Sequence, residues 1–443
     1  LRPAFETLTG KLLPLDYADN GLLMLAFLGV ALLVGFGAGS YPAVLLSAFR
    51  PAHVLKAGVN QGPHGGRLRK GLVVFQFVIS IVLMTSTAIV YDQLDYVKNK
   101  DLGFQKEQVV VVPIGHSENL RPKAEVVKQA LAQHPNVISV SASHSIPSYW
   151  LNRFAYLPEG AALEDRISLG DVSIDHDFIA MYGMEVIAGR SFSQDLASDS
   201  TAFVLNESAA QALGWSSPAE AVGEQIEWVF PMGFQGPIIG VVKDFHFGSL
   251  HTAIPPIVFH ISRFGSNFIS ARIRPDDVST TLAFLEQTWE HFEPDYPFEY
   301  FFIDESFARL YEAEERLART FGYGAALAIL IACLGLFGLA AFMAGRRKKE
   351  IGVRKVLGAS VPGLVLLLSK DFLTLVGVAF VVACPLTYLA MNTWLDNFAY
   401  RIDLSWPIFL GAGLIALLFT FLTVSYQSIR AALANPALSL RYE

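Results

Sequence analysis

Candidate catalytic and metal-binding residues are few and isolated in this sequence. Asp244 and His246, with His251 nearby, are residue types that exchange protons or bind metals, and residues 175–177 read Asp-His-Asp. Neither group has a third ligand at a recognisable spacing, and no His-Glu-x-x-His motif or Cys pair occurs. We therefore interpret both groups as polar residues of turns beside strands. We predict no catalytic residue, no metal site and no cofactor.

Motifs for nucleotide hydrolysis and for acyl transfer are also missing from the sequence. The glycine-rich stretch 58–66 lacks the Lys-Ser/Thr pair that completes a phosphate-binding loop. No Gly-x-Ser-x-Gly nucleophile elbow is present. If this protein uses ATP, a separate subunit must hydrolyse it.

The densest charge lies in the basic segment 346–355, which reads RRKKEIGVRK after a long apolar run. We expect a helix here that ends at Gly358, because glycine favours a helix C-terminus. Ser360 with Pro362 can then begin the next helix. Two interpretations stay open at this point. The charges orient the chain and touch lipid head groups, or this bent element receives motion from a protein partner.

The elements that must position this segment are membrane spans. The chain is 53% hydrophobic and 16% charged, whereas soluble domains carry about a quarter charged residues. A helix needs about 20 apolar residues to cross the hydrocarbon core, and five segments meet that length. Both cysteines, Cys333 and Cys384, lie within such segments and are interpreted as packing residues.

Basic residues orient these spans. Lys and Arg gather between the first two spans, after the third and after the fifth, which places all three clusters on one side of the membrane. By the positive-inside rule that side is the cytoplasm of a bacterial cell. Residues 92–318 hold 15 Lys/Arg against 32 Asp/Glu, whereas the rest of the chain holds 18 against 8. The acidic block therefore lies outside the plasma (inner) membrane.

The predicted domain organisation alternates spans with segments on either side. Spans are predicted at 21–46, 71–91, 319–345, 372–391 and 405–426. Segments 1–20, 92–318 and 392–404 lie outside the membrane, and the linker 47–70, the elbow 346–371 and the tail 427–443 lie in the cytoplasm. Lys370 and Asp371 sit at the cytoplasmic end of a span, where they can reach the interface at little cost. Gly335 and Gly338 allow close helix packing.

The outer block reads as an α+β domain. Strands are predicted at 108–114, 137–143, 203–205, 238–242 and 268–273, and helices at 122–133, 207–213 and 278–292. Asn206 is a plausible N-cap and Gly214 a plausible helix end. The order of the strands does not follow from these patterns.

An internal repeat links the two ends of the chain. Residues 40–55 read SYPAVLLSAFRPAHVL and residues 425–440 read SYQSIRAALANPALSL, with Ser-Tyr, Pro-Ala and a final Leu at the same offsets. Each copy follows an apolar span. The chain thus reads as the last span of one repeat followed by a complete second repeat, within a longer polypeptide.

This layout resembles the MacB/FtsX-type ABC transporter permeases, whose unit is one span, a large extracytoplasmic domain of the MacB periplasmic core type, and three more spans. Four segments carry the resemblance: RRKKEIGVRKVLGAS at 346–360, DHDFIAMYGMEVIAGRSFS at 175–193, NESAAQALGW at 206–215 and GVVKDFHFGSLH at 240–251. The order of the segments is that of the C-terminal half of a double-length, Bacteroidetes-like member.

The resemblance implies a polytopic α-helical membrane protein that couples ATP hydrolysis in a cytoplasmic ABC ATPase subunit to movement of its outer domain. It implies that the segment 346–360 is the coupling elbow, with contact residues Arg347, Glu350, Arg354 and Lys355 and the break at Gly358. Such permeases expel peptides or drugs, or extract lipoproteins.

The expected partners, besides that ATPase, are membrane lipid and an envelope component such as a periplasmic adaptor or outer-membrane channel. No nucleic acid is expected. An FtsX-like signalling scaffold, which activates a cell-wall hydrolase without transport, stays open as an alternative function.

Overall fold

The computed structural model describes residues 21–47 and 63–433, apart from positions 116, 118, 231, 232, 263 and 264. These residues form two compact units. The membrane unit contains the residues up to Tyr91, Glu314–Thr393 and the residues from Asp403 on, and the outer unit contains Asp92–Ala313 and Trp394–Ile402. The predicted segment 1–20, most of the linker 47–70 and the end of the predicted tail lie outside the described residues, as do parts of both repeat copies.

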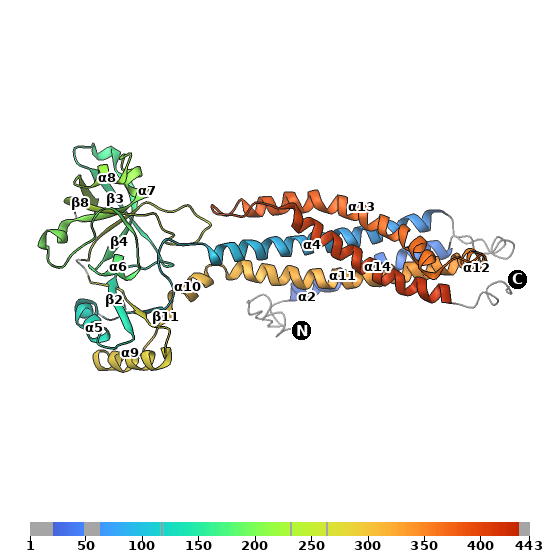
Figure 1. Ribbon diagram of the computed structural model, residues 1–443, viewed down its shortest axis with the longest axis horizontal. Coiled ribbons are helices and arrows are strands. Elements are labelled where there is room, and N and C mark those ends of the chain that lie inside the picture. Colours follow the sequence, from blue (N-terminus) through green and yellow to red (C-terminus); the bar gives the residue numbers. More distant parts are fainter. Residues whose placement is uncertain are drawn as a thin grey trace. The chain divides into compact units, whose positions relative to one another are not determined.

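Five long helices and one short helix, α12, build the membrane unit among the described residues (Figure 1). They are α2 (Gly21–Ser47), α4 (Pro63–Asn99), α11 (Glu312–Arg346), α12 (Lys348–Val356), α13 (Val361–Leu395) and α14 (Trp406–Leu433). Among the described residues, α4, α11, α13 and α14 are long and apolar enough to cross a membrane. By the same measure the apolar stretch of α2 is Leu25–Phe36, so the predicted count of five spans is approximate.

Small side chains let the spans approach one another. The buried core of the membrane unit contains alanines from three helices, namely Ala332, Ala340, Ala379, Ala383, Ala412 and Ala416. A Cβ placed on Gly335 of α11 would lie 2.8 Å from Oε1 of Gln76 in α4, so a side chain at this position would crowd α4. Gly338 has no such neighbour within 4 Å, and its packing role stays a prediction.

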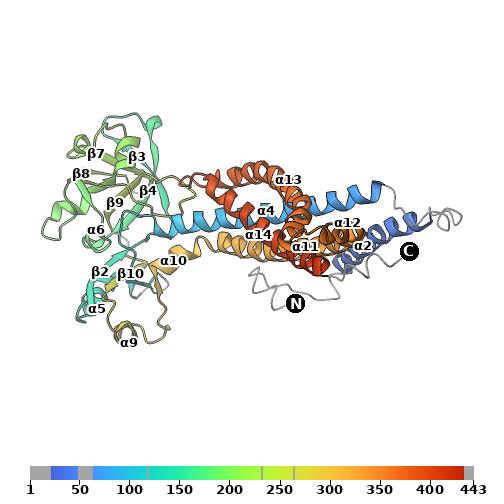
Figure 2. The ribbon, with the colours of Figure 1, turned by 45° about the vertical axis from the view of Figure 1, so that its right-hand side comes forward.

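The outer unit contains a ring of six strands (Figure 2). They are β3 (Asn152–Pro158), β4 (Ile167–Ile174), β6 (Phe203–Asn206), β7 (Gln225–Phe230), β8 (Phe234–Val242) and β9 (Ile257–Ile261). The parallel pairing of β4 with β9 closes the ring. A short strand, β5 (Val186–Gly189), pairs with β8 on the outside of this path.

The other four strands form an open sheet in the order β11–β1–β10–β2. They are β1 (Val109–Pro113), β2 (Val137–Ser143), β10 (Phe268–Ile273) and β11 (Phe301–Phe302). The open sheet joins the ring through one residue pair, Ser143 of β2 with Ile174 of β4. Apart from this pair, no strand among the described residues pairs with the edge of β2 that faces β4.

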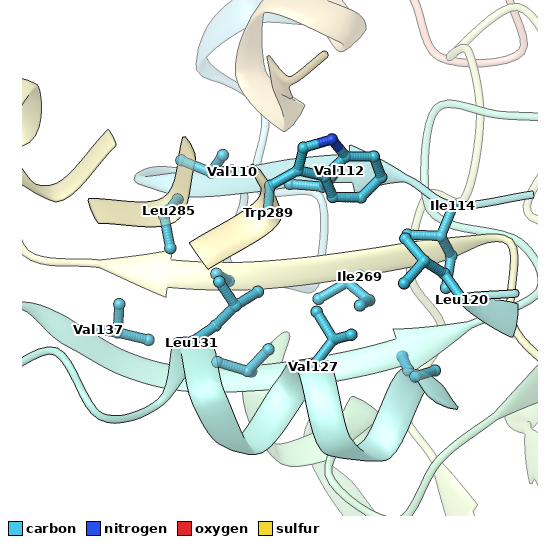
Figure 3. Packing of buried hydrophobic residues seen from close by; sticks show 14 of the residues in the cluster. Val110, Val112, Ile114, Leu120, Val127, Leu131, Val137, Ile269, Leu285 and Trp289 are labelled. Atoms are coloured by element: carbon cyan, nitrogen blue, oxygen red, sulfur yellow. The ribbon is translucent and has the colours of Figure 1, made fainter. Parts of the chain in front are cut away.

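Two amphipathic helices, α5 (Ala124–Leu131) and α9 (Val278–Phe292), pack on the open sheet. Figure 3 shows how the two helices contact the sheet. Val127 and Leu131 of α5 pack with strand residues such as Ile269, and so do Leu285 and Trp289 of α9. Burial of these side chains removes apolar surface from water, which is the main favourable term for this lobe.

Short helices complete the outer unit, namely α6 (Phe178–Met181), α7 (Glu207–Ala212), α8 (Pro218–Ala221) and α10 (Ile303–Arg309). The predicted N-cap of α7 is confirmed, because Oδ1 of Asn206 accepts the amide of Ala209 at 3.0 Å. It also accepts the amide of Ile257 at 2.7 Å, which ties the cap to β9. The helix stops before Gly214, whose φ of 105° suits glycine.

Candidate functional site

The predicted elbow is a short helix between two long ones. α12 ends at Val356, and Gly358, two residues further on, has a φ of 91°. The amide of Ala359 donates to the carbonyl of Arg354 at 2.9 Å, and that of Gly358 donates to Lys355 at 3.1 Å. These bonds satisfy the last carbonyls of α12 and turn the chain. The hydroxyl of Ser360 accepts the amide of Gly363 at 3.4 Å, at the start of α13.

Ion pairs hold the elbow in place. Nη2 of Arg347 lies 3.1 Å from Oδ2 of Asp371, which connects the start of the elbow to α13. Arg354 pairs with Glu350 at 3.0 Å along α12. Of the predicted contact residues, the structure therefore pairs Glu350 with Arg354 and places Arg347 against α13. Arg354, Glu350 and the half-buried Lys355 stay on the surface of the elbow.

The elbow has one buried and one exposed apolar side. Ile351 packs with Leu364 and Leu368 of α13, and all three are buried. On the other side Val356 is 68% exposed and Leu357 is 80% exposed. An apolar tip beside charged residues is the kind of surface on which proteins dock. It offers no group positioned for catalysis.

A second cluster, which we call the outer clamp, lies in the outer unit. It consists of the loop Trp394–Ile402, Gln93, Tyr311 and the segment 246–251. The amide of Ala399 donates to the carbonyl of His251 at 3.2 Å. The His251 ring stacks on the ring of Phe398, with centroids 4.1 Å apart. The loop that follows α13 is therefore part of the outer unit.

Gln93, near the end of α4, bonds the loop through both ends of its amide group. Its Nε2 donates to the carbonyl of Tyr400 at 3.0 Å, and its Oε1 accepts the amide of Ile402 at 2.9 Å. The side chain has an exposed fraction of 0%. Because a buried amide needs partners for both its donor and its acceptor, this residue fixes the loop in one position.

Tyr311 connects the same cluster to α11. Its hydroxyl accepts the amide of Leu250 at 2.7 Å, and its ring lies nearly parallel to that of His251, with centroids 5.9 Å apart. Tyr311 immediately precedes α11, and Phe398 follows α13 by three residues. Along the chain, the two helices that flank the elbow thus lead to rings that contact the same histidine.

The polar groups first considered for chemistry have structural partners. Asp244 accepts both the amide and the hydroxyl of Ser208, at 2.9 and 2.6 Å, at the start of α7. Asp175 and Asp177 each accept a bond from the buried Nζ of Lys128 at 2.7 Å. Burial alone would lower the pKa of Lys128, but these carboxylates raise it above its ordinary value. No group of three potential metal ligands occurs among the described residues.

Comparison with known families decides the identity of this architecture. The model of the MacB-like periplasmic core domain matches residues 72–285, and the model of the FtsX-like permease C-terminal region matches residues 323–436. The chain belongs to the MacB/FtsX-type permeases. It is a multi-pass inner-membrane protein whose α/β domain is extracytoplasmic.

Three solved structures are similar to part of this MacB/FtsX-type permease. The periplasmic region of MacB from Actinobacillus actinomycetemcomitans is 13% identical, with a TM-score of 0.35 over 47% of this chain and 94% of that one. The extracellular domain of the ABC-type transporter YknZ from Gram-positive bacteria is 16% identical, with a TM-score of 0.32 over 43% and 97%. A permease domain from Porphyromonas gingivalis is 18% identical, with a TM-score of 0.32 over 44% and 90%. A search of curated proteins finds no match.

Sequence reasoning missed the outer clamp of this permease. Gln93 is one of several polar residues that follow an apolar run, and its partners lie more than 300 positions away. From the sequence, His251 stands out only as a possible metal ligand or acid/base group beside Asp244 and His246. The available signal was its place in the segment 240–251, which resembles the family, although that segment does not reveal what the ring contacts.

The amide bonds of Gln93 can be tested by substitution. Gln93→Leu keeps a similar volume but removes both bonds, so the loop should open more often. In the full chain in lipid nanodiscs, we expect the amide of Ile402 to exchange hydrogen at least tenfold faster. Asp92→Asn, at an exposed neighbouring position, should leave this rate unchanged. Equal rates in Gln93→Leu and wild type would contradict the assigned role.

His246 should make the outer unit sensitive to acid. Its ring is buried against Tyr400, and burial, followed by the nearby cation of Lys100, lowers its pKa below the ordinary value. The unfolded chain then binds this proton at a higher pH than the folded chain. The contribution of neutral His246 to stability is therefore fully present above about pH 6.5. It is lost as the pH falls through the lower pKa of the folded state.

His246→Phe keeps a ring against Tyr400 but removes the proton site. Between pH 7.5 and 5.5, we expect the unfolding temperature of this variant to fall less than that of wild type. His144, whose pKa is lowered by its own burial, stays in both proteins and sets the residual slope. Parallel pH profiles for the two proteins would exclude His246 as a contributor.

Proposed function

We infer that this permease transmits motion from a cytoplasmic ABC ATPase to its outer unit through the elbow, α11 and α13. Permeases of this family work with such an ATPase. The observation that supports the route is the common end point of the two helices, because Tyr311 and Phe398 both contact His251. A displacement of the elbow would reach this cluster along two covalent paths.

Helix geometry suits this task. α11 and α13 have 35 residues each, which is about 50 Å of helix at 1.5 Å per residue. A hydrogen-bonded helix passes on axial and tilting motion with little compression. Pro385 removes one donor from α13, whereas α11 has no interior proline, so α11 is the stiffer of the two.

The substrate is proposed to be handled outside the membrane. Each candidate span contains an 18-residue apolar window with at most two charged residues, so the spans offer few groups for a polar conduit. We propose export of peptides or drugs, or extraction of lipoproteins, at the outer unit or the outer leaflet, with help from an envelope partner. Activation of an envelope hydrolase without transport is the competing outcome, and the large outer domain favours export.

The elbow should determine docking of the ATPase. Glu350→Arg combined with Arg354→Glu exchanges the two charges at these positions of α12. The exchanged residues can still form an ion pair one helical turn apart. With the ATPase subunit co-expressed, we expect its association with the permease to fall at least tenfold in co-purification. Loss of the permease-dependent change in ATP hydrolysis in liposomes should follow.

A matched control is the swap Glu315→Arg with Arg319→Glu, which inverts a similar pair in α11. This swap should leave association unchanged. If the elbow variant also associates like wild type, the basic cluster acts only in membrane topology and the coupling role is wrong.

His251 should act in the step that follows docking of the ATPase, when motion reaches the outer unit. His251→Ala removes the ring between Phe398 and Tyr311, so we expect the ATPase to associate normally while the outer unit no longer responds to ATP. The response is measured as the change in hydrogen exchange of the loop Trp394–Ile402 on adding ATP. His251→Phe, which keeps a stacking ring, should restore most of the change. An unaltered response in His251→Ala would rule out this path.

A further inference from the structure

An open strand edge lies in the outer unit and is not part of the outer clamp. The carbonyl of Ser143 in β2 accepts the amide of Asn267, next to β10, at 2.9 Å. The carbonyl of Ala142 accepts the amide of Asp175, and the amide of His144 donates to Ser173, so these neighbours point toward β4. Successive residues of a strand direct their main-chain groups to opposite sides.

This alternation places the N–H and C=O of Val140 on the β4 side. β4 ends at Ile174, however, and its only pairing with β2 is at Ser143. The carboxylate of Asp175 covers the amide of Ala142 at 2.8 Å. No hydrogen bond to the main chain of Val140 on this side occurs among the described residues.

A cavity of about 570 Å³ opens at this edge, between α5 and α6. Its volume lies within the range of ligand pockets, roughly 300–1,000 Å³. It is lined by Ile138, Ser139 and Val140 of β2, with Gln129 and Gln194 among the polar residues around them. In Figures 1 and 2, α5, β2 and α6 lie close together in the same lobe.

The charges around the cavity are balanced. Glu125 and Asp177 lie 3.1 and 2.7 Å from the ammonium group of Lys128, and Arg272 adds a second cation. A polyanion or polycation would therefore meet repulsion from groups of its own sign. A neutral peptide main chain needs hydrogen-bond donors and acceptors. At this cavity it meets the unpaired N–H and C=O of Val140 and the side-chain amides of Gln129 and Gln194.

The edge also lacks the usual protection against strand pairing. Exposed edges in soluble proteins commonly carry a lysine, a proline or another charge that prevents addition of a foreign strand. Here the edge segment reads Ile-Ser-Val, and the Ile138 side chain is 57% exposed. An apolar, β-branched residue beside unpaired main-chain groups favours pairing.

We propose that the β2 edge at Ile138–Val140 binds an extended peptide segment, which adds as a strand in line with β4 and pairs with the main chain of Val140. Main-chain bonds supply affinity in this mode, and side-chain pockets supply selectivity. The site gives the outer unit a place to hold an exported peptide, and in this respect it rests on the proposed export function. It does not require the ATPase, so it stands independently of the coupling route.

The test uses the full permease in lipid nanodiscs and a displayed library of nine-residue peptides. Enriched peptides are labelled with a dye, and their dissociation constants are measured by fluorescence anisotropy. Two methylated copies of each peptide are made, one with N-methyl groups at the odd residues and one at the even residues. Each copy lacks the N–H donors along one of its two edges. We expect one methylated register to bind at least tenfold more weakly and the other to bind like the parent peptide.

Ile138→Lys places a charge on the edge and should weaken binding of the parent peptide at least tenfold. Val126→Lys makes the same change at an exposed position of α5 outside the cavity and should have no effect. As a measurement that needs no variant, the amide of Val140 should exchange faster than that of Ser141 in the free protein, and peptide should slow it.

Two outcomes overturn the proposal. Equal binding of both methylated registers would show that side chains alone hold the peptide. Failure of the library to enrich any peptide over empty nanodiscs would show that the edge is closed to extended chains.

Discussion

The hydrocarbon core of the membrane imposes the constraint on which this structure depends. Main-chain polar groups in lipid must be bonded within their own segment, so the spans are helices. Two of these helices, α11 and α13, lead from the elbow to the outer unit. Small residues such as Ala379 and Gly335 let these helices pack closely where hydrophobic burial between them offers no gain over lipid.

Outside the membrane, water competes for every main-chain hydrogen bond, and the outer unit solves this in two ways. Six strands form a closed ring, so this part of the unit exposes few unpaired main-chain N–H and C=O groups. The open sheet instead covers one face with α5 and α9, and its join to the ring at Ser143 and Ile174 leaves part of the β2 edge free. The incomplete pairing of β2 with β4 makes this edge available for the proposed peptide site.

Local signals predicted the elements well because they act over a few residues. The β-branched run at 108–114 became β1, the alternating pattern at 137–143 became β2, and Asn206 caps α7 as expected. The helix predicted at 122–133 begins with a short 3-10 turn around Pro122 and ends two residues earlier than expected. The break at Gly358 followed from glycine's access to positive φ. Each of these outcomes depends on side chains within one turn or one strand.

By itself, the sequence determined that this protein spans a membrane, that its outer domain is extracytoplasmic and mixes helices and strands, and which family it resembles. Hydropathy, charge and short motifs carry that information because lipid and water act on each segment separately. Only the tertiary structure decided that six strands close into a ring, that Arg347 pairs with Asp371 and that His251 lies against Phe398 and Tyr311. Those contacts join residues far apart in the chain, and the amino-acid pattern around each partner is compatible with many others.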